Sequence, residues 1–430
     1  MAANTDCLYI CGHTQFANVV ILYSFFIRLY VLAIRLAGTW NAKAREWIHG
    51  RKDWQKRLAQ AIGPNDRIIW MHCASAGELE QGKPLVEALK AGFPNHRILL
   101  SFFSPSGFAA GKKYGVADIF TYLPADTAVN ARRFVELAHP ELVIFVKYEY
   151  WHHHLSRVAE KNIPLLLVSA IFRQKQVFFR WYGGFFRKIL GLFDQVFVQD
   201  TASAELLRQS GLKSIIAGDT RFDRVLRIAQ QAAEVPYLPE FAGTAPLIVA
   251  GSTWPEDEEL WASYMKDTPA RLVLAPHEMD KNHLDTIRKK FPGAVFYSSL
   301  PNDGLGQVKV LVIDSFGLLS RLYQYATISY IGGGFNKSGI HNTLEAATYG
   351  KPVIFGPQYG KFKEARDLVA QGAAFSIDGA ESLKIIADEL LQDEQHCRAA
   401  GAAAKKYVEE GAGATGKITG YIQEKRLLTS

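Results

Sequence analysis

Two glutamates in the first half of the chain stand just beyond short apolar runs, where a buried strand would end. Glu78 closes the sequence Ser-Ala-Gly-Glu that begins at Ser75, and Glu149 lies in the sequence Lys-Tyr-Glu-Tyr-Trp that begins at Lys147. A carboxylate at such a point can take the proton from an attacking hydroxyl, which is the role of a general base. Glu78 can equally do no more than complement a helix dipole, and Glu149 can simply pair with Lys147. Spacing alone leaves both interpretations open.

The second half carries small, hydroxyl-bearing and glycine-rich turns of the kind that hold phosphates. Backbone amides at these turns, a donor from Asn342 and an acceptor for ribose hydroxyls from Glu345 together favour a nucleotide site. The residues concerned are Ser252, Thr253, Gly333, Gly334, Asn342 and Glu345. The sequence has no Asp-x-Asp pair, which would hold the metal of a nucleotide diphosphate. We therefore expect a donor that binds without a metal, such as a nucleoside monophosphate sugar.

Short apolar runs alternate with helical patterns along most of the chain, and the runs are continuous rather than alternating, as in buried parallel strands. The runs cover residues 67–72, 97–103, 142–146, 164–169 and 195–199, then 247–250, 271–275, 308–313, 327–331 and 352–355. This pattern predicts an α/β chain of two doubly wound domains, with ligands in a cleft at the strands' carboxyl ends. The expected divisions are an N-terminal segment 1–57, a first domain 58–223, a linker 224–246 and a second domain 247–430. Alternatively, the last helices of residues 247–430 pack back on the first domain.

The N-terminal segment carries a membrane signal. Residues 17–27 are nearly all apolar, and the pattern continues to Leu36, interrupted by Arg28 and Arg35. The two arginines are seven residues apart, which suits a helix lying in the membrane interface or a short span with snorkelling arginines. Between residues 43 and 57 six basic residues face two acids, so we expect this flank at an anionic cytoplasmic leaflet. A core helix of the first domain is the competing interpretation.

Composition excludes several classes of protein. The chain of 430 residues is 48% hydrophobic and 21% charged, which disfavours disorder and a polytopic membrane protein. Its net charge of +7 favours anionic partners. Four cysteines are too few for a disulfide scaffold, and no structural metal is expected. Three consecutive histidines, 152–154, have the wrong spacing to converge on one metal and are predicted to lie on the surface.

Five basic residues without an acid interleave with aromatic residues between Ser169 and Phe193. Arg173 and Arg180 belong to this set. Docking to an anionic lipid is the simpler interpretation beside a membrane segment, although aromatic residues of this kind also stack RNA bases. A core helix with solvated arginines on one face is a further alternative.

Taken together, these motifs resemble the Kdo transferases of lipopolysaccharide synthesis, glycosyltransferases of the GT-B fold with two facing Rossmann-like domains. The segments that carry the resemblance are Ser75–Glu78, Tyr148–Trp151, Gly218–Asp223, Gly251–Thr253, Gly339–Glu345 and Gly350–Pro357. The resemblance implies inverting transfer of 3-deoxy-D-manno-oct-2-ulosonic acid (Kdo) from CMP-Kdo to a tetraacylated lipid A precursor. It also implies a catalytic body in the cytoplasm, held at the inner membrane by one N-terminal segment.

The resemblance assigns roles to individual residues. Glu78 matches the family's general base, Glu149 an essential glutamate near the acceptor, and Glu345 a nucleotide-binding residue. The family's Pro-Arg-His is replaced here by Pro276-His277-Glu278. His277 or Lys337 is therefore expected to stand in for that arginine at the CMP phosphate. For the acceptor and its lipid, the expected contacts are Ser75, Gly77, Lys147, Arg173 and Arg180.

The expected partners are thus CMP-Kdo, a lipid A precursor and anionic inner-membrane lipids, with no nucleic acid and no metal cofactor. Two rivals stay open: another GT-B enzyme that uses a UDP-sugar, whether transferase or epimerase, and a non-catalytic scaffold that binds a membrane or RNA. The sequence leaves open the oligomeric state, the number of Kdo residues added, and whether residues 17–36 span the membrane or lie on it.

Overall fold

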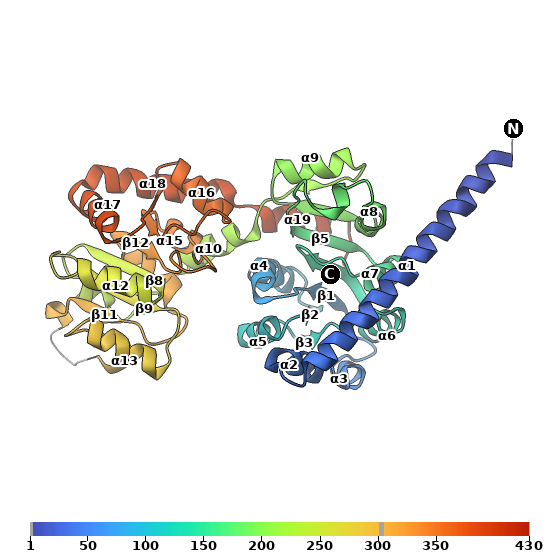
Figure 1. The fold of residues 1–430 in the computed structure, drawn as a ribbon, viewed down its shortest axis with the longest axis horizontal. Helices are drawn as coiled ribbons and strands as arrows, with labels where there is room; N and C mark the ends of the chain where they lie inside the picture. Colours follow the sequence, from blue (N-terminus) through green and yellow to red (C-terminus); the bar gives the residue numbers. More distant parts are fainter. Residues whose placement is uncertain (1–2, 301–304, 430) are drawn as a thin grey trace. The chain divides into compact units, whose positions relative to one another are not determined.

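The computed structural model describes residues 3–300 and 305–429, with side chains from residue 18 onward. These residues form two compact units (Figure 1). The first contains the chain up to Asp223 together with the segment from Gly413 onward, and the second contains Arg224–Ala412.

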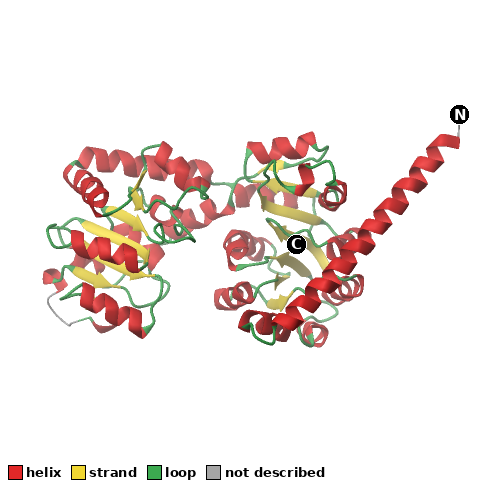
Figure 2. Ribbon diagram, in the orientation of Figure 1, coloured by secondary structure: helices red, strands yellow, loops and turns green. Residues whose placement is uncertain are grey.

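The first unit is built on a parallel sheet. Within the described residues the sheet has seven strands in the order β3-β2-β1-β4-β5-β6-β7. Figure 2 draws strands in yellow and helices in red. The strands are β1 (Ile68–His72), β2 (Arg97–Phe102), β3 (Ile119–Tyr122), β4 (Pro140–Val146), β5 (Leu165–Ala170), β6 (Gln195–Val198) and β7 (Ile215–Ile216). Parallel pairing brings the carboxyl ends of β1 and β4 to the same edge as neighbours.

Helices cover both faces of this sheet, which explains why its strands are continuously apolar. One face packs against α3 (Trp54–Ala61), α6 (Ala128–Ala138), α7 (His152–Glu160), α8 (Gly184–Leu190) and α9 (Thr201–Gln209). The other packs against α4 (Ala76–Gly92), α5 (Pro105–Tyr114) and α19 (Ala414–Glu424). Side-chain oxygens of Ser75, Ser104, Thr127 and Asp200 cap the amino ends of α4, α5, α6 and α9.

Two further helices precede α3. The long helix α1 (Ala3–Ala37) runs across the first unit, and its amino end extends beyond the unit (Figure 1). It is followed by α2 (Ala42–Gly50). The guanidinium of Arg51, just after α2, is buried and donates to the carbonyls of Trp47, Phe103 and Leu123. Burial lowers the pKa of Arg51 to about 9, and these bonds fix α2 to the loops after β2 and β3.

The second unit repeats the architecture. Among its described residues the sheet is parallel and seven-stranded, in the order β10-β11-β9-β8-β12-β13-β14. The strands are β8 (Leu247–Thr253), β9 (Arg271–Pro276), β10 (Val295–Phe296), β11 (Val310–Val312), β12 (Ile328–Ile331), β13 (Val353–Phe355) and β14 (Ala374–Ser376). α12 (Pro255–Tyr264), α13 (Lys281–Lys290) and α17 (Ala380–Gln392) cover one face. Its remaining α-helices are α11 (Leu238–Ala242), α14 (Leu319–Leu322), α15 (Leu344–Ala347), α16 (Lys363–Ala370) and α18 (Glu394–Gly411).

The structure refines the expected divisions at both ends of the second domain. The expected linker 224–246 contains most of α10 (Thr220–Gln230) and all of α11, and it groups with the second unit. Residues from Gly413 onward belong to the first unit, which is the alternative that the sequence left open for the last helices. The reason is packing: the apolar side of α19 completes the core over α4, and Asp223 accepts bonds from the amides of Gly413 and Thr415.

Ile418 of α19 tests this packing because its side chain is fully buried in the first unit's core. We expect Ile418→Ala to destabilise the first unit by about 3 kcal/mol, since it removes buried methyl groups and leaves a cavity. Urea unfolding of the full chain measures the change. Gln423→Ala, an exposed position on the same helix, is the control and should shift the midpoint little. Equal shifts for the two variants would contradict the packing role of α19.

Candidate active site

Glu78 lies in the first turn of α4, directly after β1. Ser75 is the N-cap of this helix: its hydroxyl oxygen accepts from the Glu78 amide at 3.5 Å and donates to the Glu78 carboxylate at Oε2. This arrangement follows the spacing of a capping box, in which the third helical residue is glutamate. Glu78 therefore has a structural role at the helix start, and its half-buried carboxylate also lies at the carboxyl edge of the sheet.

Glu149 lies in the turn between β4 and α7. Its Oε2 accepts from Trp151 Nε1 at 2.5 Å and lies 3.4 Å from His72 Nε2. His72 is fully buried at the end of β1, and its other ring nitrogen lies 2.8 Å from the hydroxyl of Ser101, which also accepts from the Trp70 indole. A chain of buried polar contacts thus fixes one oxygen of Glu149.

The two glutamates converge on the same edge. Burial raises the pKa of the Cys73 thiol well above its usual value, and the charges of Glu78 and Glu149 raise it further. Both carboxylates therefore lie within electrostatic range of one residue at the end of β1. Lys147 directly follows β4 and has φ of 67°, and Ser169 near the end of β5 has φ of 53°. Such left-handed backbone in non-glycine residues is typical of functional strand ends.

The expected acceptor residues are spread over this edge and beyond it. Ser75, Gly77 and Lys147 lie at the two strand ends just described. Arg173 is exposed after β5, and its charge acts on Tyr148, as does the charge of Glu78. Arg180 instead lines a separate groove with Trp181 and Arg187. The structure therefore places Arg173 and Glu78 within electrostatic range of the same residue, Tyr148, but assigns Arg180 to a different surface.

Asp126 is a site residue that the sequence interpretation missed. Its carboxylate, in the loop after β3, is 2% exposed and accepts from the amides of His153 and His154 at 3.0 and 2.9 Å. It also accepts from Tyr23 of α1 at 2.6 Å and lies 2.5 Å from His154 Nδ1. Burial alone would raise the pKa of Asp126, but the bond and charge of His154 hold it below its usual value. Asp126 thus fixes the start of α7, three residues after Glu149.

The three histidines are not a surface feature, contrary to expectation. His152 and His154 are buried, because α7 turns both toward the interior of the unit. His154 pairs with Asp126, and His153 Nε2 lies 2.8 Å from the hydroxyl of Ser24 on α1. Among the described residues no group of histidine, cysteine and carboxylate side chains has the arrangement of a metal site.

In the second unit, the turn after β8 is occupied by the protein's own carboxylate. Ser252 has φ of 54°, and Trp254 is the N-cap of α12. The buried Asp257 accepts from the amides of Trp254 and Gly333, each at 2.9 Å, and from the Tyr330 hydroxyl at 2.6 Å. The Thr253 hydroxyl lies 3.4 Å from Glu258. This helix start therefore already holds an anionic group.

The glycine-rich turn after β12 is needed for close backbone packing. A Cβ on Gly332 would lie 2.1 Å from the carbonyl oxygen of Ser252, and one on Gly334 would lie 2.5 Å from the backbone of Gly356. Gly333 and Gly334 are buried, and the Gly333 amide donates to Asp257. The expected contact between the Gly333 amide and a phosphate is therefore replaced, in this conformation, by a bond within the protein.

Side chains around this turn remain at the surface. The exposed His277, after β9, stacks on Trp254 with ring centroids 4.8 Å apart and lies 4.4 Å from the ring of His341. Trp254 Nε1 donates to His341 Nε2 at 3.3 Å. Because β9, β8 and β12 are neighbours, these three rings form one cluster at the sheet edge. Trp254 and His341 were not among the predicted donor-site residues, although both directly adjoin predicted turns.

The other predicted donor residues lie along the next turn. Asn342 Nδ2 donates to Glu345 Oε1 at 3.1 Å, and Asn342 Oδ1 accepts from the Leu344 amide at 3.2 Å. Lys337 is exposed, and its carbonyl accepts from the Lys361 ammonium. These side chains can offer an amide, a carboxylate and an ammonium to a nucleotide.

Comparison with known proteins matches most of the chain to one kind of transferase. Residues 52–224 match the family model described as 3-deoxy-D-manno-octulosonic-acid transferase (kdotransferase). The 3-deoxy-D-manno-octulosonic acid transferase of Aquifex aeolicus is 29% identical over 75% of this chain and 86% of that protein. The enzyme of the same name from Bordetella pertussis is 27% identical over 85% and 89%. Most of the chain is therefore similar to Kdo transferases, and residues 52–224 match the model of that family.

Solved structures of low sequence identity share the fold of this chain. UDP-GlcNAc 2-epimerase from Neisseria meningitidis aligns with a TM-score of 0.53 and 15% identity over 80% of this chain and 99% of that one. A glycosyltransferase from Rickettsia africae aligns with a TM-score of 0.53 and 13% identity over 85% and 100%. The predicted GT-B class, two parallel α/β units with one apolar N-terminal helix, is confirmed.

Asp126 gives a prediction about the structure of the site. We expect Asp126→Ala to destabilise the first unit by roughly 3 kcal/mol, because it leaves two amides, a hydroxyl and an imidazole without their buried partner. Tyr23→Phe removes one of these bonds and should cost about 1 kcal/mol. Urea unfolding measures both, with the exposed Glu160→Ala as control. A shift for Asp126→Ala no larger than that of the control would contradict the network.

His341 gives a prediction about pH. The pKa of His341 is lowered from 6.5 to about 4, mainly by burial and to a smaller extent by the charge of His277. Between these two values the unfolded chain binds a proton that the folded chain does not, so stability falls as pH falls from 6.5 to 4. His341→Gln should remove roughly 3 kcal/mol of this dependence. Thermal unfolding of both proteins across this range measures it, and identical pH profiles would show that His341 is not the group.

Proposed function

We propose that this protein transfers Kdo from CMP-Kdo to a hydroxyl of a tetraacylated lipid A precursor, with inversion at the anomeric carbon. The match of residues 52–224 to the Kdo transferase family model and the similarity to curated Kdo transferases support the reaction. The observation that carries the assignment of the site is the convergence of Glu78 and Glu149 at neighbouring strand ends, inside the segment that matches the family model.

In this proposal Glu78 is the general base. Its carboxylate receives the proton of the acceptor hydroxyl, and that oxygen attacks the anomeric carbon from the face opposite CMP. The bond between this carbon and the CMP phosphate oxygen breaks, and CMP leaves with the bonding electrons. Ser75 occupies one oxygen of Glu78, so the acceptor hydroxyl either uses the other oxygen or displaces the serine. Glu149 is held through Oε2 by Trp151 and His72. Its other oxygen can accept from a second hydroxyl of the acceptor and fix the sugar's orientation.

The second unit binds the donor in this proposal. His277 and Lys337 contact the CMP phosphate in place of the family's arginine, and Asn342 and Glu345 contact the nucleoside. At the phosphate, the imidazole of His277 donates a hydrogen bond and the ammonium of Lys337 supplies positive charge, so a single phosphate can be held without a metal. Ser252 lies at the strained end of β8 beside them. The proposed reaction therefore needs no metal and should proceed in the presence of EDTA.

The proposed location is the cytoplasmic face of the inner membrane. One described helix, residues 18–37, is long and apolar enough to reach into a membrane, and the basic flank follows it. Lipid A precursors carry acyl chains, so an enzyme that modifies their sugar hydroxyls must work at a membrane surface. Membrane attachment and acceptor class therefore support each other.

A comparison of three variants separates the base from the helix cap. Glu78→Gln keeps an acceptor for the Ser75 hydroxyl but cannot take a proton, and we expect transfer to fall at least about 100-fold. Ser75→Ala removes the cap and keeps the base, and we expect a loss below about ten-fold. Glu160→Gln, on the exposed end of α7, should leave transfer unchanged.

The measurement is mass spectrometry of the lipid after incubation with tetraacyl lipid A precursor and a CMP-Kdo supply. The number of Kdo increments also counts the residues added. Similar losses for Glu78→Gln and Ser75→Ala would show that Glu78 only caps α4. No increment from the folded wild-type protein, together with thermal stabilisation by UDP and not by CMP, would favour a UDP-sugar enzyme.

A further inference from the structure

The burial of α1 follows the period of a helix. Between residues 18 and 37 the partly covered positions are 20, 23, 24, 27, 31, 34 and 37, and the others are exposed. Spacings of three and four residues define one face of a helix. α1 therefore lies against the first unit along nearly the whole length of its apolar segment.

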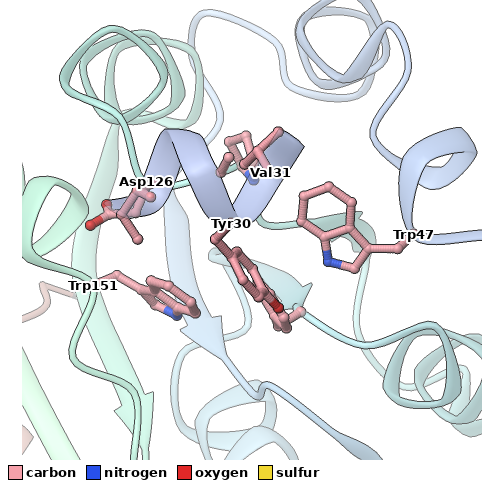
Figure 3. Close-up of a pocket in the computed structure, with 9 residues that line it drawn as sticks. Tyr30, Val31, Trp47, Asp126 and Trp151 are labelled. Atoms are coloured by element: carbon pink, nitrogen blue, oxygen red, sulfur yellow. The ribbon is translucent and has the colours of Figure 1, made fainter. Parts of the chain in front are cut away.

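Specific contacts fix this face. The Tyr23 hydroxyl donates to Asp126, and the Ser24 hydroxyl lies 2.8 Å from His153. One turn and more further along, the ring of Tyr30 stacks on Phe103 with centroids 6.4 Å apart. Figure 3 shows Tyr30 and Val31 of α1 beside Trp47, Asp126 and Trp151, the indole that bonds Glu149. The docked face is thus both polar and apolar, and it extends over several turns.

The opposite face of α1 is a continuous apolar surface, which we term the outer stripe. Its exposed fractions run from 48% for Leu29 to 67% for Ile21. The outer stripe consists of Ile21, Leu22, Phe25, Phe26, Leu29, Leu32 and Leu36. Soluble surfaces rarely expose so many large apolar side chains together.

Two arginines mark one border between the docked face and the outer stripe. A helix turns about 100° per residue, so Arg28 lies about 100° from Ile27 on the docked face, and Arg35 lies about 20° from Arg28. Both are exposed. On the side of the helix that carries the two arginines, Arg35 lines a groove of about 510 Å³. His49, Lys52 and the buried Arg51 also line this groove, and none of its described lining residues is acidic. The border is therefore suited to phosphate groups.

A helix docked in this way cannot also cross a bilayer. The segment 18–37 is long enough to span, but Tyr23 and Ser24 within it are bonded to Asp126 and to the start of α7. Spanning would carry these loops into hydrocarbon, where irregular backbone and a carboxylate have no water to bond. A helix in the plane of the interface meets no such conflict, because its lower face enters the acyl region and its upper face meets protein.

We propose that α1 lies parallel to the membrane surface, with the outer stripe in the acyl layer and Arg28 and Arg35 bound to the phosphates of anionic lipids. The first unit then sits directly on the bilayer, joined to it by the docked face of α1. This proposal concerns the membrane surface alone and stands whether or not the enzyme transfers Kdo.

Depth measurements along the outer stripe distinguish lying from spanning. A bimane label is attached to a single introduced cysteine in the full chain, at Leu22→Cys, Leu29→Cys or Leu36→Cys. To prevent labelling elsewhere, Cys7, Cys11 and Cys397 are changed to serine. Cys73 is kept because its side chain is buried. The chain is bound to phosphatidylcholine vesicles containing phosphatidylglycerol and lipids brominated at known depths. The outer positions are about 21 Å apart along the helix. We expect equal, shallow depths at all three positions. A deepest label at position 29, or no quenching at any position, would overturn the proposal.

Charge variants test the contacts themselves by sedimentation with the same vesicles. Phe25→Glu, on the outer stripe, should weaken binding at least about ten-fold, because it replaces a large apolar group that enters the acyl layer. Val129→Glu is the matched control: Val129 is 62% exposed on α6, against 59% for Phe25. Changing Arg28 and Arg35 to glutamine should weaken binding about five-fold per residue on anionic vesicles, with little change on neutral ones. Equal losses for Phe25→Glu and Val129→Glu would contradict the outer stripe.

Discussion

The buried carboxylate of Asp126 is the interaction on which the first unit's site depends. A charge that is 2% exposed is stable only when its oxygens are fully bonded, and four groups meet this requirement: two amides, a hydroxyl and an imidazole. These groups come from two separate parts of the chain, α1 and the start of α7. The carboxylate therefore fixes the N-terminal helix and the turn containing Glu149 to the same loop. Neither element could move without breaking a buried charge's bonds.

The second unit also contains a buried carboxylate whose oxygens are bonded, that of Asp257. It accepts hydrogen bonds from an amide at the start of α12, from the Gly333 amide in the turn after β12 and from the Tyr330 hydroxyl within β12. Burial raises the pKa of Asp257, while these bonds oppose the rise. The consequence for ligand binding is that the backbone amides of Trp254 and Gly333 are already used. In the proposed donor site this leaves side chains at the rim, among them the ring cluster of Trp254, His277 and His341, to contact an anionic donor.

Much of this organisation could be predicted from the sequence, because buried parallel strands leave a strong apolar signal. The ten predicted runs all correspond to strands, and the strands that were missed, β3, β7, β10 and β14, have four residues or fewer. Missing β3 also hid Asp126, since a carboxylate is noticed at a strand end only when the strand is recognised. The burial of His154 had no local signal, because its partner lies 28 residues away. Likewise, the place of α19 depends on tertiary packing and not on any pattern within residues 413–430.

The N-terminal helix shows why composition could not decide between spanning and lying. Hydropathy averages over all faces of a helix, and α1 is apolar enough on average to cross a bilayer. What decides is the bond from Tyr23 to a residue about a hundred positions later, which exists only in the folded unit. If α1 lies in the interface, the same bond holds the Glu149 turn at the level of the lipid headgroups. The proposed lipid acceptor would expose its sugar hydroxyls at that level, where the enzyme could reach them without withdrawing the acyl chains from the membrane.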